Sequence, residues 1–164
     1  GGSLGSENIN NAVRSILDSL LKDFNVCHIC GKGNVKDELN NLNGYKQFEY
    51  VNEEQPHLYA LADLVVSRAG ATVLYELLAL KKPNLLIPLS RAASRGDQIQ
   101  NAASFEKQGY SMVLPEEELD GGSLINAIYD LWRNAERFTV SMKKSTDVRG
   151  VQSVLMVIKK YSDG

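Results

Sequence analysis

One acidic residue stands inside an apolar segment of this chain, where its carboxylate could bind a ligand. The segment SRAGATVLYELLAL, residues 67–80, carries Glu76 among leucines. A carboxylate there can accept two hydrogen bonds from a cis-diol, such as the paired hydroxyls of a ribose. The alternative interpretation is a solvated glutamate on a surface helix, as most glutamates are.

The turn before Glu76 supplies a second candidate group, a set of backbone amides. Gly70 permits a tight turn, and a helix that begins after it has no internal partners for its first N–H groups. These groups lie at the positive end of the helix dipole and suit an anion. They belong to Ala71, Thr72 and Val73.

The chain opens with another small-residue segment, GGSLGSENINN at residues 1–11. Small residues before a helix let backbone N–H groups approach an anion, and the loop before the first helix of a doubly wound fold is the usual diphosphate site. Ser3 and Gly5 lie in this loop. The alternative is a flexible tag remnant, which Gly-Gly-Ser alone would fit.

Two further segments carry polar groups. In PLSRAASRGDQIQNA, residues 88–102, three side chains converge at a helix start and suit sugar hydroxyls: Asp97, Gln98 and Asn101. The alternative reads Asp97 as a helix N-cap with exposed amides behind it. Near Val51, an extended segment could offer backbone N–H and C=O groups to the edge of a base.

The cysteines and histidines favour structural roles. Cys27 and Cys30 have C-x-x-C spacing, which is compatible with a redox or metal site. On the strand that NVCHIC predicts, however, positions i and i+3 point to opposite faces. We therefore expect two reduced core cysteines of a cytosolic protein, no metal and no cofactor. His28 and His57 stand in no nucleophile motif.

Composition excludes several classes of function. The 164 residues suffice for one domain with a full core, and a net charge of −2 gives no global attraction to nucleic acid or anionic lipid. Basic residues lack aromatic interleaving, so we expect no nucleic-acid partner. No apolar run approaches the ~20 residues of a membrane span, and no signal peptide opens the chain.

Alternating elements must position the candidate groups. The patterns predict helices over about 7–23, 34–42, 54–61, 72–80 and 97–108, strands over 25–30, 45–50, 63–67, 84–89 and 110–114, and a loop or short acidic turn over 115–122. This predicts one α/β domain, residues 1–164, with a Rossmann-like parallel sheet, helices on both faces and a C-terminal helical segment over about 123–164. Ligands of such sheets bind at the carboxyl ends of strands.

Three segments together resemble, in order and spacing, the C-terminal half of the MurG family. They are GGSLGS, ADLVVSRAGATVLYELLALKKPNLLIPL and RGDQIQNAASFEKQG, and the resemblance runs from residue 1 to about 115. Members of that family are bacterial glycosyltransferases that move N-acetylglucosamine (GlcNAc) from UDP-GlcNAc to the lipid-linked muramoyl-pentapeptide precursor of peptidoglycan. They have the GT-B fold, in which the C-terminal domain binds the nucleotide sugar.

The resemblance implies a role for each candidate group. Glu76 would hold the ribose diol, and the backbone of Val51 would read the uracil edge. The amides after Gly70, together with Ser3 and Gly5, would contact the phosphates, and the GlcNAc hydroxyls would meet Asp97, Gln98 and Asn101. This chain departs from the family pattern at Leu4 and Asp97, where glutamine is common.

The resemblance also implies a missing half. The family's N-terminal domain carries the acceptor site, the membrane-facing surface and the proposed catalytic base, and the strand expected before Gly1 is absent. We expect a fragment that binds UDP-GlcNAc but transfers nothing alone, from an inverting, metal-independent enzyme that is cytoplasmic and peripheral on the plasma membrane. The alternatives are the donor-binding subunit of a two-chain GlcNAc transferase and a non-catalytic nucleotide-sugar binding module.

Overall fold

Parallel strands form the centre of the computed structural model, which describes residues 6–145. Within that range the strands are β1 (Val26–Ile29), β2 (Tyr45–Phe48), β3 (Val65–Ser67), β4 (Asn84–Leu86) and β5 (Met112–Val113). Every pairing is parallel, which confirms the prediction from the alternation of elements. Each predicted strand is present, although each is shorter than its apolar pattern.

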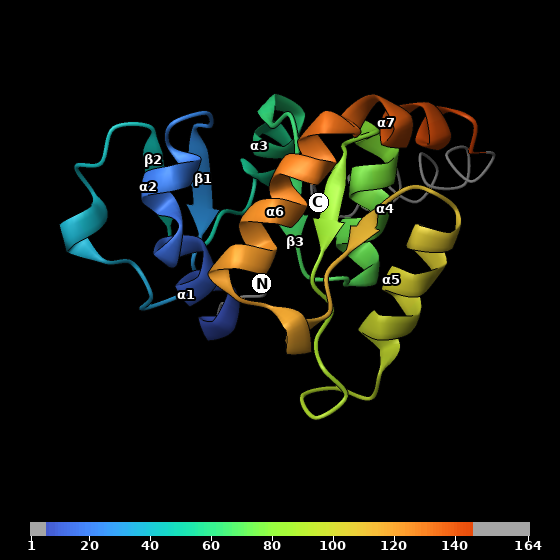
Figure 1. Cartoon of the computed structure of the whole chain (residues 1–164), viewed down its shortest axis with the longest axis horizontal. Coiled ribbons are helices and arrows are strands. Elements are labelled where there is room, and N and C mark those ends of the chain that lie inside the picture. The colour runs from blue at the N-terminus through green and yellow to red at the C-terminus, as the bar shows by residue number, and fades with distance from the viewer. Residues whose placement is uncertain (1–5, 146–164) are drawn as a thin grey trace, which may run out of the picture.

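The ladders form two sheets rather than one continuous sheet. β1 pairs with β2, and the second sheet has the order β3-β4-β5. Within residues 6–145, the edge of β1 away from β2 and the edge of β3 away from β4 have no strand partner. In Figure 1 the strands follow one another from left to right, with β1 and β3 at the neighbouring ends of the two sheets. One hydrophobic core, which includes Leu17, Tyr45 and Leu86, joins the sheets where no ladder does.

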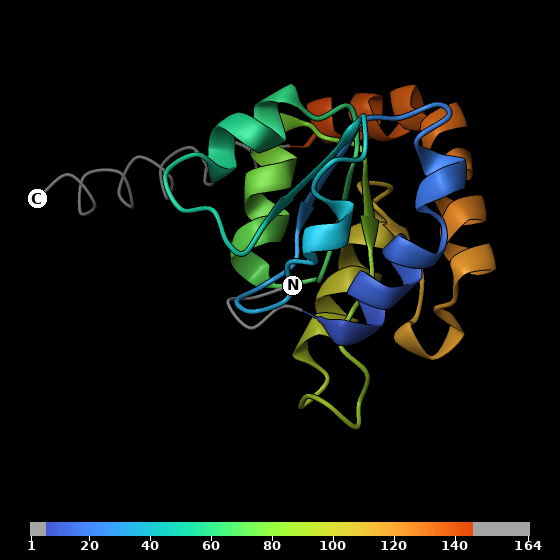
Figure 2. The same cartoon turned by 90° about the vertical axis from the view of Figure 1, so that its left-hand side faces the viewer.

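Helices cover both faces of the strands, as predicted. Their bounds are α1 (Glu7–Ser15), α2 (Leu17–Leu20), α3 (Gln55–Leu61), α4 (Ala71–Leu80), α5 (Asp97–Lys107), α6 (Gly121–Arg133) and α7 (Ala135–Lys143). Figure 2 shows α1, α2 and α6 on one side of the strands and α3 and α4 on the other. α6 and α7 confirm the first part of the predicted C-terminal helical segment, and its remainder lies outside the described residues.

Two predicted helices differ in the structure. The pattern over 7–23 is divided at Ile16, whose φ of −118° is not helical. The stretch 34–42 forms only a short 3-10 turn, Asp37–Leu39. Its backbone is diverted by Gln47 of β2, whose side chain accepts from Lys36 N at 3.2 Å and donates to Lys36 O at 2.9 Å. These contacts take the polar groups that a first helical turn would otherwise use.

α1 is held close to the strands and to α6. Asn10 donates to Cys30 O at 2.8 Å, and its side-chain oxygen lies 2.9 Å from Nε2 of His28. The other ring nitrogen of His28 lies 2.8 Å from the Tyr45 hydroxyl. A Cβ on Gly121 of α6 would meet Ser15 Oγ at 2.6 Å, so only glycine allows this approach of α6 to α1.

The cysteines and histidines are structural or peripheral. Cys27 and Cys30 are both free, with Cys27 exposed and Cys30 buried. They therefore point to opposite faces as predicted, but the placement of Cys27 in the core was wrong because its face of β1 is open. Burial, with a contribution from Arg14, lowers the pKa of His28 to about 4, so this histidine is neutral at pH 7.

Candidate functional site

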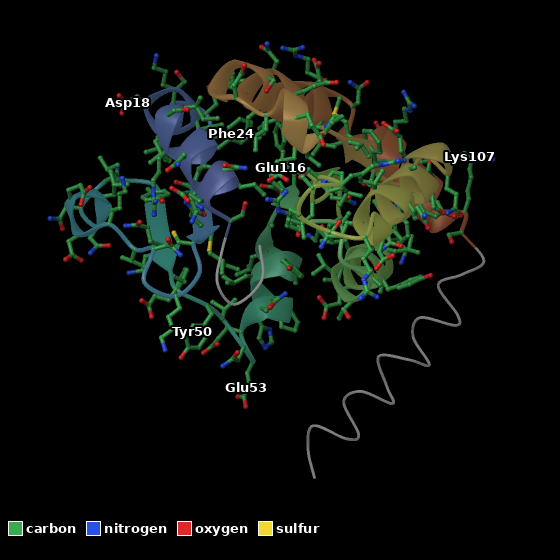
Figure 3. The ribbon with its side chains drawn as sticks, turned by 90° about the horizontal axis from the view of Figure 1, so that it is seen from below. Asp18, Phe24, Tyr50, Glu53, Lys107 and Glu116 are labelled. Atoms are coloured by element: carbon green, nitrogen blue, oxygen red, sulfur yellow. The ribbon has the colours of Figure 1, made fainter. Side chains whose placement is uncertain are left out.

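The loops that leave the carboxyl ends of the strands gather at one end of the molecule. Val51 follows β2, Arg68 to Gly70 follow β3, residues 87–96 follow β4, and Glu116 follows β5. Figure 3 looks onto this end and shows Glu116 beside α1. Open parallel sheets bind their ligands at this end.

The first turn of α4 is exposed and lacks a side-chain cap. Gly70 is its N-cap, with φ of −70° and no capping hydrogen bond. The turn that Gly70 was expected to permit does not depend on glycine, because any residue adopts this φ. A Cβ at Gly70 would meet nothing within 4 Å, so glycine instead keeps open the space before the amides of Ala71, Thr72 and Val73.

Glu76 lies one turn further along α4 with a carboxylate oxygen that has no partner. Its Oε2 is buried and makes no hydrogen bond within the described residues. Burial raises the pKa of this carboxyl. A buried acceptor without a donor costs about 1–3 kcal/mol. Glu76 is half-buried, so it differs from a fully solvated surface glutamate, which would carry no such cost.

Tyr59 of α3 faces the same region as Glu76. Its hydroxyl accepts from Gln55 Nε2 at 2.8 Å. Burial raises the pKa of Tyr59, and the charge of Glu76 adds to this effect while the Gln55 hydrogen bond opposes it. Tyr59 was not among the residues singled out from the sequence, and its signal there is weak because it stands in an ordinary helical pattern.

Val51 lies half-buried in the segment between β2 and α3. Its backbone N–H and C=O make no hydrogen bond within residues 6–145. The predicted role of this backbone toward a base edge stays a prediction.

The start of α5 carries three polar side chains in two different situations. Asp97 is exposed, and the N-cap is Gly96 with φ of 90°, so the N-cap interpretation of Asp97 was wrong. Gln98 accepts from Leu89 N through Oε1 at 3.1 Å. Asn101 donates to Ala69 O at 3.1 Å. Both amides therefore hold the loops after β3 and β4 with one end, and no hydrogen bond to the other end is present within the described residues.

A cavity of about 260 Å³ lies at the same end, on the loop before α5. Its lining comprises Arg91, Ser94, Arg95, Gly96, Ile99 and Gln100. Neither arginine makes an ion pair with a described carboxylate. The cavity lies beside Asp97 and is separate from the turn that precedes α4.

A buried ion pair at this end was missed from the sequence. Arg68 Nη2 lies 2.5 Å from Glu116 Oε1, and both side chains are only 9% exposed. Burial alone would raise the pKa of Glu116, but hydrogen bonds from Arg68, Ser90 N and Asn8 lower it overall. The available signal was the placement of opposite charges directly after two predicted strands of one parallel sheet.

Two predicted site residues cannot be placed, since Ser3 and Gly5 lie outside the described residues. The helix that follows them begins with Ser6 as its N-cap, which accepts from Ile9 N at 3.4 Å. Among the described residues, no group of three or more His, Cys, Asp or Glu side chains is arranged to hold a metal ion. No helix of this part is long and apolar enough to cross a membrane.

Comparison with known families shows the family of this chain. A model described as the glycosyltransferase family 28 C-terminal domain matches residues 1–156. The chain belongs to this family. The match covers all the strand-end loops described above, so the family 28 domain includes the whole candidate site.

Curated relatives of this family 28 domain are twice its length. The UDP-N-acetylglucosamine–N-acetylmuramyl-(pentapeptide) pyrophosphoryl-undecaprenol N-acetylglucosamine transferase of Clostridium perfringens is 58% identical over 160 residues, 98% of this chain and 45% of that protein. The transferase of the same name from Clostridium botulinum is 59% identical over 162 residues, 99% of this chain and 46% of that protein. The chain thus spans about half the length of the curated relatives it matches.

Solved structures show the same fold. MurG of Acinetobacter baumannii has a TM-score of 0.71 at 24% identity, over 98% of this chain and 48% of that one. A glycosyltransferase of kitacinnamycin also has a TM-score of 0.71, at 19% identity, over 98% of this chain and 41% of that one. These likenesses confirm the predicted α/β architecture of a GT-B glycosyltransferase half.

Proposed function

We propose that this chain is the UDP-GlcNAc-binding domain of a GlcNAc transferase that acts on the lipid-linked peptidoglycan precursor. The observation that carries the proposal is the buried, unpartnered Oε2 of Glu76, one turn beyond the open amides of α4. A ligand that brings hydroxyl donors to this oxygen removes the cost of leaving it unpaired. The names of the curated relatives supply the sugar and the acceptor.

The nucleoside would lie between α3 and α4. Glu76 would accept from the ribose hydroxyls, because a carboxylate has enough lone pairs for both. The unpaired backbone groups of Val51 would pair with the uracil edge, and Tyr59 would border the ribose. The unpaired backbone groups of Val51 and the unpaired oxygen of Glu76 support this arrangement.

The diphosphate would meet amides rather than a metal. The N–H groups of Ala71, Thr72 and Val73 carry the positive end of the α4 dipole, and Ser3 and Gly5 would approach from the loop before α1. As the bond from the sugar to UDP breaks, negative charge grows on the departing phosphate. Fixed amides stabilise that charge without reorganising.

The sugar would lie toward the start of α5. Gln98 has its amide nitrogen and Asn101 its side-chain oxygen left for hydroxyl groups, since the opposite ends bind Leu89 N and Ala69 O. Asp97 is exposed beside them. One donor and two acceptors suit a hexose with several hydroxyls.

The remaining half of the enzyme would bring the acceptor. Because the curated relatives are about twice as long as this chain, we assign the lipid-linked acceptor, the general base and the contact with the cytoplasmic face of the membrane to the part outside it. The chain alone would bind donor without transferring sugar, and the reaction would invert the anomeric carbon.

Calorimetric titration of this chain tests the proposal. We expect binding of UDP and UDP-GlcNAc but not of ADP. Glu76→Ala should weaken UDP about 100-fold, the size expected for losing two hydrogen bonds to a charged group. Glu106→Ala, which removes an exposed glutamate of α5, is the matched control and should bind like the unmodified chain. A folded chain that binds no uridine nucleotide would refute the proposal.

A further inference from the structure

We propose that the Arg68–Glu116 ion pair positions the first turn of α1 against the first turn of α4, so that both sets of amides face one diphosphate. The inference rests on the proposed function and adds two positioning residues to it. Figure 3 shows Glu116 beside α1, although the two are far apart in the chain.

Several separate segments converge on this pair. Arg68 Nη2 donates to Ser6 Oγ at 2.6 Å, and Nη1 donates to Ile87 O at 3.1 Å and Pro88 O at 3.4 Å. Glu116 accepts from Ser90 N at 2.9 Å through its other oxygen. The pair therefore ties together α1 and the loops that follow β3, β4 and β5.

Both terminal nitrogens of Arg68 are already occupied. Nη1 has two carbonyl acceptors, and Nη2 has a hydroxyl and a carboxylate. An amino group of guanidinium has two hydrogens, so neither is left for a phosphate. Four of the five N–H donors of Arg68 are thus used within the protein, which makes positioning its main role despite its charge and its place at the phosphate end.

The ion pair contacts α1 at Ser6, the N-cap of this helix. Ser6 Oγ receives both Ile9 N and Arg68 Nη2. Asn8, in the first turn, donates to Glu116 Oε1 at 3.2 Å. On the α4 side, Gly70 lies only two residues after Arg68. Movement of the ion pair would therefore move the two helix starts relative to each other.

Such movement would affect one part of the ligand only. A diphosphate between two helix starts needs both sets of amides at hydrogen-bond distance, and a displacement of about 1 Å is costly to that geometry. Uracil and ribose would depend on Val51 and Glu76, and no hydrogen bond joins either residue to the pair within the described residues. Loss of the pair should thus weaken binding of UDP and leave binding of uridine unchanged.

Titration of the chain with UDP and with uridine tests this separation in the Glu116→Gln variant. We expect UDP to bind about tenfold more weakly, the effect of one charge-assisted hydrogen bond, and uridine affinity to be unchanged. Asp130→Asn, which breaks the exposed pair with Arg133, is the control and should alter neither. Equal weakening of both ligands, or no weakening, would overturn the proposal.

Asn8→Ala gives a second test that leaves the ion pair in place. It removes only the exposed contact from α1 to Glu116, so the fold is retained and a smaller loss of UDP affinity is expected, again without loss of uridine affinity. An affinity for UDP equal to that of the unmodified chain would count against the role of the network.

Hydrogen exchange separates this inference from the proposed function. In Glu116→Gln the amides of Ile9 and Asn10 should exchange faster, while those paired between β1 and β2 keep their protection. This holds even if the chain binds no UDP, in which case the proposed function fails first. Unchanged exchange at Ile9 and Asn10 would refute the positioning role by itself.

Discussion

The half-buried Glu76 and the buried Arg68–Glu116 pair are charged groups at the same end of the molecule, and they differ in their hydrogen bonding. Oε2 of Glu76 has no partner within the described residues. Both oxygens of Glu116 and both terminal nitrogens of Arg68 are fully paired. A carboxylate with an unused acceptor can take a further hydrogen bond, whereas an ion pair whose terminal atoms are already hydrogen-bonded mainly holds the surrounding loops. Charge and burial alone would not have distinguished the two.

The largest effect should come from breaking the saturated pair. Arg68→Met leaves the Glu116 carboxylate buried without its partner, so the free energy of unfolding should fall by about 4 kcal/mol. Denaturant titration followed by circular dichroism measures it. The double variant Arg68→Met, Glu116→Met should recover most of the loss, because no uncompensated charge remains. A double variant as unstable as the single one would show that the loss comes from packing.

A second saturated cluster, Asn10 with His28 and Tyr45, should make stability depend on pH. The pKa of His28 is about 4 in the folded chain, against 6.5 ordinarily. Between these values the unfolded chain binds a proton at His28 that the folded chain does not bind. Stability should therefore be lost as pH falls from 6.5 toward 4, by up to about 3 kcal/mol.

Unfolding titrations at a series of pH values check this dependence. His28→Gln should flatten the loss between pH 6.5 and 4, and His57→Gln, at an exposed histidine, should leave it unchanged. The same slope in all three proteins would contradict the assignment to His28.

Replacing Glu76 should raise the free energy of unfolding rather than lower it. Burial raises the pKa of Glu76, so its ionised form destabilises the folded chain at neutral pH. Glu76→Met should raise the free energy of unfolding by up to about 1 kcal/mol, while it weakens binding of UDP about 100-fold, as Glu76→Ala should. Thermal unfolding at pH 7 measures the first effect and titration the second. If Glu76→Met lowered the free energy of unfolding as much as Arg68→Met does, Glu76 would not be an unpaired acid and would not differ from the ion pair.

The smallest effect should come from an ion pair at the surface. Arg133 and Asp130 are 67% and 51% exposed, although their atoms are 2.9 Å apart. Asp130→Asn should change the free energy of unfolding by less than about 0.5 kcal/mol. Denaturant titration at low and high salt checks this, and a larger loss would mean that the pair has a structural role that its exposure does not suggest.

Local sequence patterns predicted much of the fold and singled out Glu76. The apolar segments placed every strand, and α5 ends at Lys107, one residue before the predicted end of the helix over 97–108. Glu76 could be found because a charged residue stands out among leucines at helical spacing. Its lack of a partner, in contrast, is visible only once α3 and α4 are packed.

The Arg68–Glu116 pair was missed because it depends on contacts between segments that are distant in the chain. Arg68 and Glu116 are 48 residues apart, and their meeting follows from the order β3-β4-β5, which alternation alone does not fix. The division into two sheets was missed for the same reason. The failure over 34–42 also has a distant cause, since Gln47 on β2 takes the backbone groups of Lys36.

The most direct test of the central claim is a cycle that pairs Glu76 with the ribose hydroxyl it would bind. Titrations compare UDP with 2′-deoxy-UDP on the unmodified chain and on Glu76→Ala. If Glu76 holds the diol, loss of the 2′ hydroxyl should weaken binding about tenfold in the unmodified chain and have no effect in the variant. An equal ratio of the two affinities in both proteins would show that Glu76 does not contact the ribose.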